Sequence, residues 1–495
     1  MKNYAWILVI AACAFFGLPN GSAGAEDTIK SKALPPIPLS LNEVLAWIDR
    51  SHPLLKGAGT EKASARGKML KALGAFEPIL VNDTEIERFI DKGTTKTQSV
   101  GFNDTLVEAR TPWGFRGSAG IRQAIGDAKI PDLGFGNGQQ VVLGGFLPLL
   151  KGLMINPENA ELQRSELADP RAEVKISQTR QDLFLAAASQ FWDWVSAAKF
   201  VDVQRRALGV AEERLRQVEG RAKAGAVAPL DVVEAGQEVQ RRREIAITAQ
   251  RAVEQEQYKL SMFLWENQTP TAPQLERVPD FPPPATLPTA EIVKADKLQA
   301  KSDRPEIREV DIEAKVNNID LELAKNTLLP SLALEAAPAR APEKFVLGLG
   351  YRFGAELRIP ILQRRSRGEV MEAQAQADRL VLVQKYREQQ VVVDVDNAVS
   401  AIERAKERVA AAAESLRMAK TLEEGERFRF SLGATSVLFV NLRERNSVDS
   451  EMQLVRAKAD YQKALALYQW ATGSWARSQP SAVPVNYRVG ASFSK

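Results

Sequence analysis

The sequence has almost no cysteine or histidine. Its 495 residues include one of each, Cys13 and His52. Metal sites need several such ligands close together, and the sequence has no cluster of that kind. A glycine-rich phosphate loop and a nucleophile motif are absent as well. His52 precedes Pro53, and we interpret it as part of a helix stop rather than as a catalytic or metal-binding residue. We therefore expect no enzyme activity, no metal and no cofactor.

The sequence also has little net charge and no long apolar run beyond its N-terminus. The formal net charge is +4, which is small for this length and argues against nucleic acid as the main partner. Hydrophobic residues make up 45% of the chain and charged residues 26%. No segment after the N-terminus is long and apolar enough to be read as a transmembrane helix.

The N-terminus has the pattern of a secretory signal peptide. Lys2 supplies the positive charge, residues 5–18 form the apolar core, and Ala23-Gly24-Ala25 is a small-residue cleavage site. Cleavage after Ala25 would start the mature protein at Glu26. The mature chain would then contain no cysteine, and therefore neither a disulfide nor a thiol nucleophile.

Lipidation is an alternative for the same segment. Residues 10–13 read Ile-Ala-Ala-Cys, which has the form of a lipobox in which Cys13 is acylated. This interpretation leaves an unusually short leader and places Cys13 inside the apolar core. A lipid-anchored protein and one that is cleaved after Ala25 differ only in this respect.

Residues 345–359, FVLGLGYRFGAELRI, alternate strictly between apolar and polar or small residues. Such alternation predicts a β-strand with one apolar and one polar face. The strand is long enough to cross a bilayer at a tilt, for which about 9–11 residues suffice. An edge strand of a soluble sandwich is the alternative. In a membrane, Arg352 and Glu356 would face a pore or a polar rim, and the lipid-facing residues would be Leu347, Leu349, Tyr351 and Phe353.

The chain repeats the same order of elements twice. Ser40 and Glu43 form a capping box that opens a short helix, which ends before Pro53. A second short helix ends before Pro305, 252 residues later, and the next prolines, Pro78 and Pro330, are also 252 residues apart. Strands follow in both halves. An internal repeat of this kind indicates two copies of one structural unit.

The first half is longer in its strand region. Its strands end at Pro148 and those of the second half at Pro360, an offset of only 212 residues. The first half therefore carries about 40 additional residues, rich in glycine and containing Trp113 and Phe115. This segment is either an added hairpin or a long surface loop.

A long helical pattern follows the strands in each half. In the first half it covers residues 158–221, with a kink or restart expected at Pro170. The second half has a cleaner heptad, in which one seam position is always alanine, so that helices can approach closely. The two seam positions hold Val395, Ile402, Val409 and Leu416, and Ala398, Ala405, Ala412 and Ala419.

Each long helical pattern stops at a glycine, Gly225 or Gly433, and a second helix starts after it. Helix, turn and returning helix predict a long antiparallel hairpin in each half. A proline-rich segment separates the halves. The resulting division is a signal peptide at 1–25, a first repeat at 26–267, a linker at 268–290, a second repeat at 291–473 and a tail at 474–495.

These features together resemble the TolC-type family of outer-membrane efflux proteins. The likeness covers residues 41–473, and its most specific parts are the duplication and the turn sequences GAVAPLDVVEA and GATSVLFVNLR. The resemblance implies a mainly α-helical fold with a membrane β-barrel contribution. Three copies would share one tube, each giving four strands to a twelve-stranded barrel and extending its coiled-coil hairpins through the periplasm.

The same resemblance implies a function and partners. The expected role is a passive exit duct of a tripartite efflux or type I secretion system in the outer membrane. Its partners would be an inner-membrane pump and a periplasmic adaptor, which would dock at the hairpin tips. The tip residues are Ala224, Gly225, Ala226, Leu432, Gly433, Ala434 and Thr435. The alternative, a periplasmic adaptor or structural coiled-coil protein, is disfavoured because adaptors contain a single hairpin. The sequence does not identify the cargo.

The resemblance also places a periplasmic gate just beyond the turns. Where well-known members carry two aspartates in the second repeat, this chain has Phe439 and Leu442. The first repeat instead has Asp231 and Glu234 at the equivalent distance from Gly225, on one helix face. These acids could form a ring that retains cations. They could equally serve only to stabilise the helix N-terminus.

Overall fold

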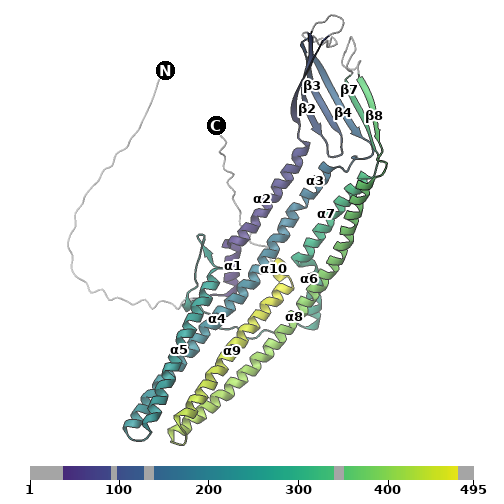
Figure 1. The fold of residues 1–495 in the computed structure, drawn as a ribbon. Coiled ribbons are helices and arrows are strands. Elements are labelled where there is room, and N and C mark those ends of the chain that lie inside the picture. Colours follow the sequence, from purple (N-terminus) through teal and green to yellow (C-terminus); the bar gives the residue numbers. More distant parts are fainter. Residues whose placement is uncertain (1–36, 91–96, 127–138, 339–350, 478–495) are drawn as a thin grey trace, which may run out of the picture. The chain divides into compact units, whose positions relative to one another are not determined.

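The computed structural model describes residues 37–90, 97–126, 139–338 and 351–477 (Figure 1). The chain from Pro38 onward forms one compact unit. The predicted signal peptide, Cys13, Leu347 and Leu349 lie outside the described residues. Within these residues, none of the helices combines the length and the apolar character needed to cross a bilayer.

The two predicted short helices and the helices after them are present. The Ser40 hydroxyl accepts a hydrogen bond from the Glu43 amide at 3.2 Å, which caps the first helix as the sequence predicts. Proline begins the second helix of each pair, where its missing amide hydrogen is no loss. The bounds are α1 Leu41–Ser51, α2 Pro53–Leu73, α6 Ala290–Asp303 and α7 Pro305–Thr327.

The residue at the joint of each helix pair makes the same kind of contact. His52 lies between α1 and α2, and its Nε2 donates to the Met262 carbonyl at 3.2 Å, because its Nδ1 already accepts from the Leu54 amide. Arg304 lies between α6 and α7 and donates to the Ala471 carbonyl, also at 3.2 Å. Both carbonyls belong to the C-terminal ends of returning helices, where donors satisfy unpaired backbone groups.

Six strands form one antiparallel sheet in the order β1-β2-β3-β4-β7-β8. The first half supplies four strands and the second half two. The implied contribution of four strands per chain is therefore wrong, because the additional residues of the first half form a paired hairpin rather than a surface loop. The strands are β1 Ile79–Ile90, β2 Thr97–Arg110, β3 Arg116–Gly126, β4 Gln139–Pro148, β7 Ser331–Pro338 and β8 Tyr351–Arg358.

The long helices form two antiparallel hairpins. The restart expected near Pro170 is present: the helical pattern breaks at Leu167 and a new helix begins at Ala168, with Pro170 in its first turn. The longest helix has 68 residues and spans about 100 Å at 1.5 Å per residue. The bounds are α3 Pro157–Glu166, α4 Ala168–Lys223, α5 Pro229–Ser261, α8 Arg364–Ser431 and α9 Val437–Ala471.

The predicted helix seams are buried. In α8, Val395 and Ala398 are fully buried, and Ile402, Ala405 and Val409 are at most 9% exposed. Nearer the turn, the seam residues Ala412, Leu416 and Ala419 are only half-buried. Alanine at these positions allows α9 to pack closely against α8. An apolar stripe of α4 lies in the largest core cluster and comprises Phe184, Ala188, Phe191, Val195 and Ala198.

The helices form two rows, one next to the sheet and one towards the hairpin turns, and α8 is the last helix of both rows (Figure 1). Next to the sheet, the packing order is α2, then α3 and α4, then α7, then α8. Towards the hairpin turns, the order is α5, α4, α9, α8. One flank of the chain is therefore formed by β1, α2 and α5, and the opposite flank by β8 and α8.

The proline-rich segment between the halves is extended and packed. Its start makes a two-stranded hairpin, β5 Trp265–Glu266 and β6 Thr269–Pro270. Further along, Phe281 stacks on Trp192, with ring centroids 5.8 Å apart. The segment is thus fastened to the core cluster of α4, and is not a free spacer. A short helix, α10 Ser474–Arg477, ends the described chain.

Candidate functional site

The two faces of the sheet differ in chemistry. Val142 and Ala333 are buried on the face that carries the charged side chains, whereas Phe353 on the other face is 80% exposed. The charged face carries Asp83, Glu85, Asp104, Arg116, Arg122, Glu335, Glu356 and Arg358. The apolar face carries Leu80, Val107, Ile121, Leu143, Leu334, Phe353 and Leu357. A sheet that exposes its apolar side chains in this way needs an apolar environment on that side.

Side-chain pairs on the charged face hold the hairpin strands in register. Arg122 of β3 makes two hydrogen bonds to Asp104 of β2, at 2.7 and 2.6 Å, and lies over the Phe102 ring. Arg116 of β3 lies 4.2 Å from the centroid of the Phe146 ring on β4. The first pair therefore joins the two strands of the added hairpin, β2 and β3, and the second ties the hairpin to its neighbour β4.

The predicted lipid-facing residues are only partly described. Phe353 of β8 shares the apolar face with Leu357, and Glu356 falls on the charged face. The side chains of Tyr351 and Arg352, like Leu347 and Leu349, lie outside what the structure describes. Their exposure to lipid or to a pore stays a prediction.

The apolar face carries a polar cluster on β1 and β2. Asn82 donates to Asn103 and to Thr105, at 2.9 and 2.8 Å, and Asn103 donates to Thr84 at 2.8 Å. The four side chains satisfy one another, which reduces the cost of placing them among apolar neighbours.

Both hairpin turns have the same backbone geometry. Gly225 and Gly433 have φ angles of 70° and 74°, which glycine adopts without strain. The amide of Ala226 donates to the Arg221 carbonyl, and that of Ala434 to the Arg429 carbonyl, both at 2.9 Å. These bonds define Schellman motifs that close α4 and α8. A Cβ on either glycine would meet no atom within 4 Å, so backbone conformation alone requires glycine here.

Arg221 connects the two turns. Its Nη1 donates to the Phe430 carbonyl at 3.1 Å, and its guanidinium lies 4.7 Å from the centroid of the Phe430 ring. The predicted tip residues of the two repeats are therefore brought together at one end of the hairpins. Their role as a docking surface stays a prediction.

The predicted gate residues lie at the start of the returning helices. Asp231 accepts a hydrogen bond from the Ala228 amide at 3.2 Å, which is the helix-end role that we weighed for it. Glu234 is half-buried. Phe439 and Leu442 are 54% and 45% exposed in the single chain. A ring formed by several chains stays a prediction.

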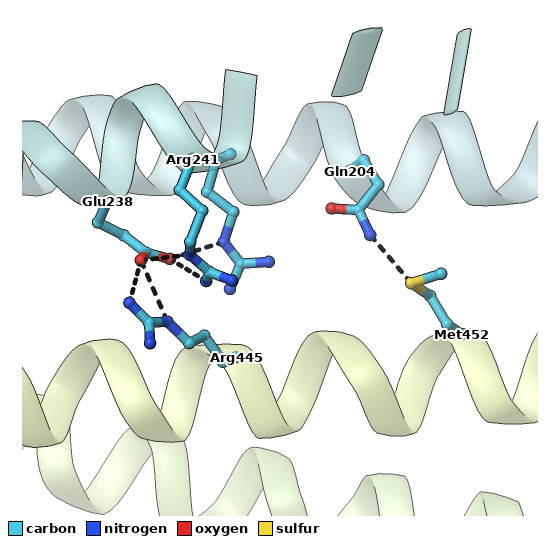
Figure 2. Close-up of polar contacts among 6 residues, drawn as sticks. Gln204, Glu238, Arg241, Arg445 and Met452 are labelled. Carbon is cyan, nitrogen blue, oxygen red and sulfur yellow. Dashed lines mark hydrogen bonds and ion pairs between the residues drawn. The ribbon is translucent and has the colours of Figure 1, made fainter. Parts of the chain in front are cut away.

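A buried ion-pair cluster joins the two hairpins beyond the turns (Figure 2). Glu238 of α5 is 4% exposed and accepts hydrogen bonds from Arg241, Arg242 and Arg445. Burial raises the pKa of Glu238, but the hydrogen bonds and charges of Arg241 and Arg445 outweigh this effect and hold the pKa at about 2. Because Arg445 belongs to α9, the cluster fastens one repeat to the other.

A second cluster joins the hairpins on α4 and α8. Arg214 donates to Glu444 of α9 at 2.7 Å, and Arg427 of α8 donates to the same carboxylate at 3.0 Å. Burial lowers the pKa of Arg214 despite the attraction of Glu444. Sequence analysis missed both clusters. The sequence does place charged residues, Glu238, Glu444 and Arg445, 11–13 positions after the turn glycines. Periodicity alone does not show whether such charged residues are buried or face the solvent.

The fold matches solved membrane proteins. No model of a known protein family matches the sequence, and no curated protein matches it. A structure of CusC, studied for transmembrane channel formation, matches with a TM-score of 0.64 at 15% identity, over 87% of this chain and 91% of that chain. The CmeC outer membrane channel of Campylobacter jejuni matches with a TM-score of 0.63 at 13% identity, over 89% and 87%.

The MtrE outer membrane channel of Neisseria gonorrhoeae, in its open state, matches with a TM-score of 0.60 at 17% identity, over 88% of each chain. The protein thus has the fold of outer-membrane channel proteins. The mainly α-helical, duplicated architecture implied by the sequence resemblance is confirmed, apart from the number of strands.

Proposed function

We propose that this protein is an outer-membrane exit duct of a tripartite efflux or type I secretion system. The observation that carries the proposal is a six-stranded sheet with one charged face, one exposed apolar face and two open edges, β1 and β8. An open edge is not tolerated in lipid, because its backbone groups have no hydrogen-bond partners there. Copies joined edge to edge remove the problem, and place the apolar faces outward and the charged faces around a pore.

The flanks of the helices support the same assembly. On α8, four side chains at helical spacing are each more than 60% exposed: Met371, Leu382, Tyr386 and Val393. On the opposite flank, α5 exposes Val233, Ile247 and Tyr258 to a similar degree. Two different apolar surfaces on opposite flanks suit head-to-tail contacts, which close into a ring. We propose a homotrimer, as the TolC-type resemblance implies.

In this assembly, the helices extend from the outer membrane into the periplasm. We propose that the tips around Gly225 and Gly433 dock a periplasmic adaptor, which links the duct to an inner-membrane pump. The small residues Ala226 and Ala434 leave both tips accessible to a partner backbone. Transport through such a duct is passive, because the pump supplies the energy.

Docking can be separated from assembly by substitution at the tips. Ala226→Trp with Ala434→Trp should abolish efflux while the oligomer and its membrane insertion remain intact. The matched control is Ala413→Trp, at an exposed position on α8 away from the turns. Normal efflux by the double variant would remove the docking proposal and leave the duct proposal standing.

The duct itself is tested with purified protein. The oligomer extracted from outer membranes should have the mass of three chains, and should pass ions in proteoliposomes down a gradient without nucleotide. A monomeric particle, or an inserted oligomer that passes no ions in any preparation, would contradict the proposal.

A further inference from the structure

The added hairpin is a continuous part of the sheet. On one side of the hairpin, which consists of β2 and β3, β2 pairs with β1 from Ile79 with Glu108 to Ile90 with Thr97. On the other side, β3 pairs with β4 from Arg116 with Phe146 to Gln123 with Gln139. The hairpin therefore cannot lie beside a smaller barrel as a separate flap without breaking both ladders.

The hairpin also has the features of a membrane-facing element. Ile121 of β3 and Leu143 of β4 continue the apolar face across it and are 46% and 39% exposed. The turn between β2 and β3 lies at the end of the sheet that faces the helices, and carries Trp113 stacked on Phe115, with ring centroids 5.4 Å apart. Exposed tryptophan at the end of an apolar strand face is typical of a membrane interface.

Six strands also occupy about the same length of a ring as the helices next to them. Four helical positions lie side by side next to the sheet, occupied by α2, α3 with α4, α7 and α8. At about 8–10 Å between axes, they take up about 32–40 Å of a ring. Strands about 4.8 Å apart and tilted by about 40° take up about 6.3 Å each, which gives about 38 Å for six and about 25 Å for four. Six strands therefore continue the helical wall without narrowing it.

The sheet can close in a ring without parallel pairs. All neighbouring strands are antiparallel, so the edge strands β1 and β8 run in opposite directions. We infer that β1 of one copy pairs with β8 of the next, and that three copies form an eighteen-stranded barrel. This inference rests on the proposed homotrimer.

The consequence is a wider outlet. The backbone radius of an eighteen-stranded barrel is about 18 Å, against about 12 Å for twelve strands at the same tilt. The charged face would line this outlet, with Glu85, Asp104 and Arg122 from the added region and its neighbour. Because lining side chains take a similar depth from both radii, the barrel would admit hydrated solutes at least half as wide again as those that a twelve-stranded barrel admits.

Strand counting by cryo-electron microscopy tests the inference on the full-length assembly in a lipid nanodisc. We expect a closed tube with eighteen strands and with β1 paired to β8 of the adjacent copy. A closed tube with twelve strands, with the hairpin outside the wall, would overturn this inference and leave the proposed function intact. A particle that is not a tube would overturn both.

A deletion variant provides a second measurement. Removing residues 97–138 deletes β2, β3 and the residues between β3 and β4, so that β1 is followed in sequence by β4. The radius of the largest neutral polymer that enters the barrel from the outer side should then fall by at least about a third. An unchanged size limit in a correctly inserted variant would overturn the inference. If the variant does not assemble, the strand count of the native protein decides the question.

Discussion

Glu238 of α5 and Arg445 of α9 form an ion pair between the two repeats, with the Arg445 Nε 3.1 Å from the Glu238 Oε2. The carboxylate is 4% exposed and the guanidinium 39%. Glu238 also accepts hydrogen bonds from Arg241 and Arg242 of its own helix. Glu238 is therefore a buried acid with three arginine partners, whereas Arg445 is accessible to solvent.

This asymmetry predicts unequal effects of substitution. Glu238→Ala leaves Arg242 buried without its carboxylate, and should lower the free energy of opening of the α5–α9 contact by roughly 3–5 kcal/mol. Arg445→Ala should cost about 1 kcal/mol or less, because solvent screens that partner. Hydrogen exchange in α5 measures both values. Glu213→Ala, which breaks an exposed pair with Arg216, is the control with little effect. Equal losses for Glu238→Ala and Arg445→Ala would contradict the account.

Acid should loosen the joint between α1 and α2. Burial lowers the pKa of His52 below its usual 6.5, despite the hydrogen bond to Met262. The folded protein therefore favours the neutral ring, whose Nδ1 accepts from Leu54. The neutral His52 ring therefore stabilises the folded state fully above about pH 6.5. This contribution is lost as the pH falls through the pKa of His52 in the folded state, which lies below 6.5. Faster hydrogen exchange of α2 amides between pH 7.5 and 5.5, corrected for intrinsic rates, should reveal the effect. In His52→Asn, which keeps a capping acceptor, this pH dependence should vanish.

The alanine seam should reject larger side chains. Ala405 is 6% exposed between α8 and α9, so Ala405→Leu should destabilise the hairpin by about 1–3 kcal/mol through overpacking. Ala413→Leu, on the exposed side of the same helix, should have little effect. An unchanged melting temperature of the oligomer carrying Ala405→Leu would show that the seam is not closely packed.

Neighbouring residues of β8 should tolerate charge differently. Phe353→Arg places a cation on the apolar face, and should cost roughly 2–4 kcal/mol if the residue lies near the bilayer midplane. Gly354→Arg lies on the charged face, where a Cβ meets only the Glu335 Cβ at 3.8 Å. Unfolding from lipid vesicles by denaturant compares the two. Equal stability would refute the assignment of the faces.

The acids beyond the first turn offer a test of the gate. If Asp231 and Glu234 form a ring in the oligomer, Asp231→Asn with Glu234→Gln should reduce cation selectivity and block by multivalent cations. Planar bilayer recordings measure both properties. Unchanged selectivity would leave only the helix-end role, which the hydrogen bond from the Ala228 amide already supports.

Much of the fold followed from local patterns in the sequence. Prolines and glycines mark the ends of most elements. The buried face of α8 could be predicted from its heptad, because alanine and β-branched residues recur there at the helical period. The strands of the first half were harder to place. Glycines at 117, 120, 144 and 145 interrupt their alternation, and the register depends on long-range partners such as Asp104 with Arg122.

Less of the candidate site could be predicted. The turn glycines were identifiable because many helices end at a residue in the left-handed conformation, which glycine adopts without strain. The buried clusters around Glu238 and Glu444 were not, because a charged residue on a helix is usually solvated and its burial depends on the packing of a distant helix. Placement of the gate and docking residues in an oligomer depends on contacts between chains, which the single chain does not contain.

The most direct test of the central claim is fractionation of cell membranes, followed by single-particle imaging of the detergent-extracted protein. The account predicts recovery with the outer membrane, as a closed trimeric tube with a strand-walled end and a helical end. Recovery as a monomer, or as a particle with no continuous wall, would contradict the claim that copies of this chain join edge to edge to form a duct.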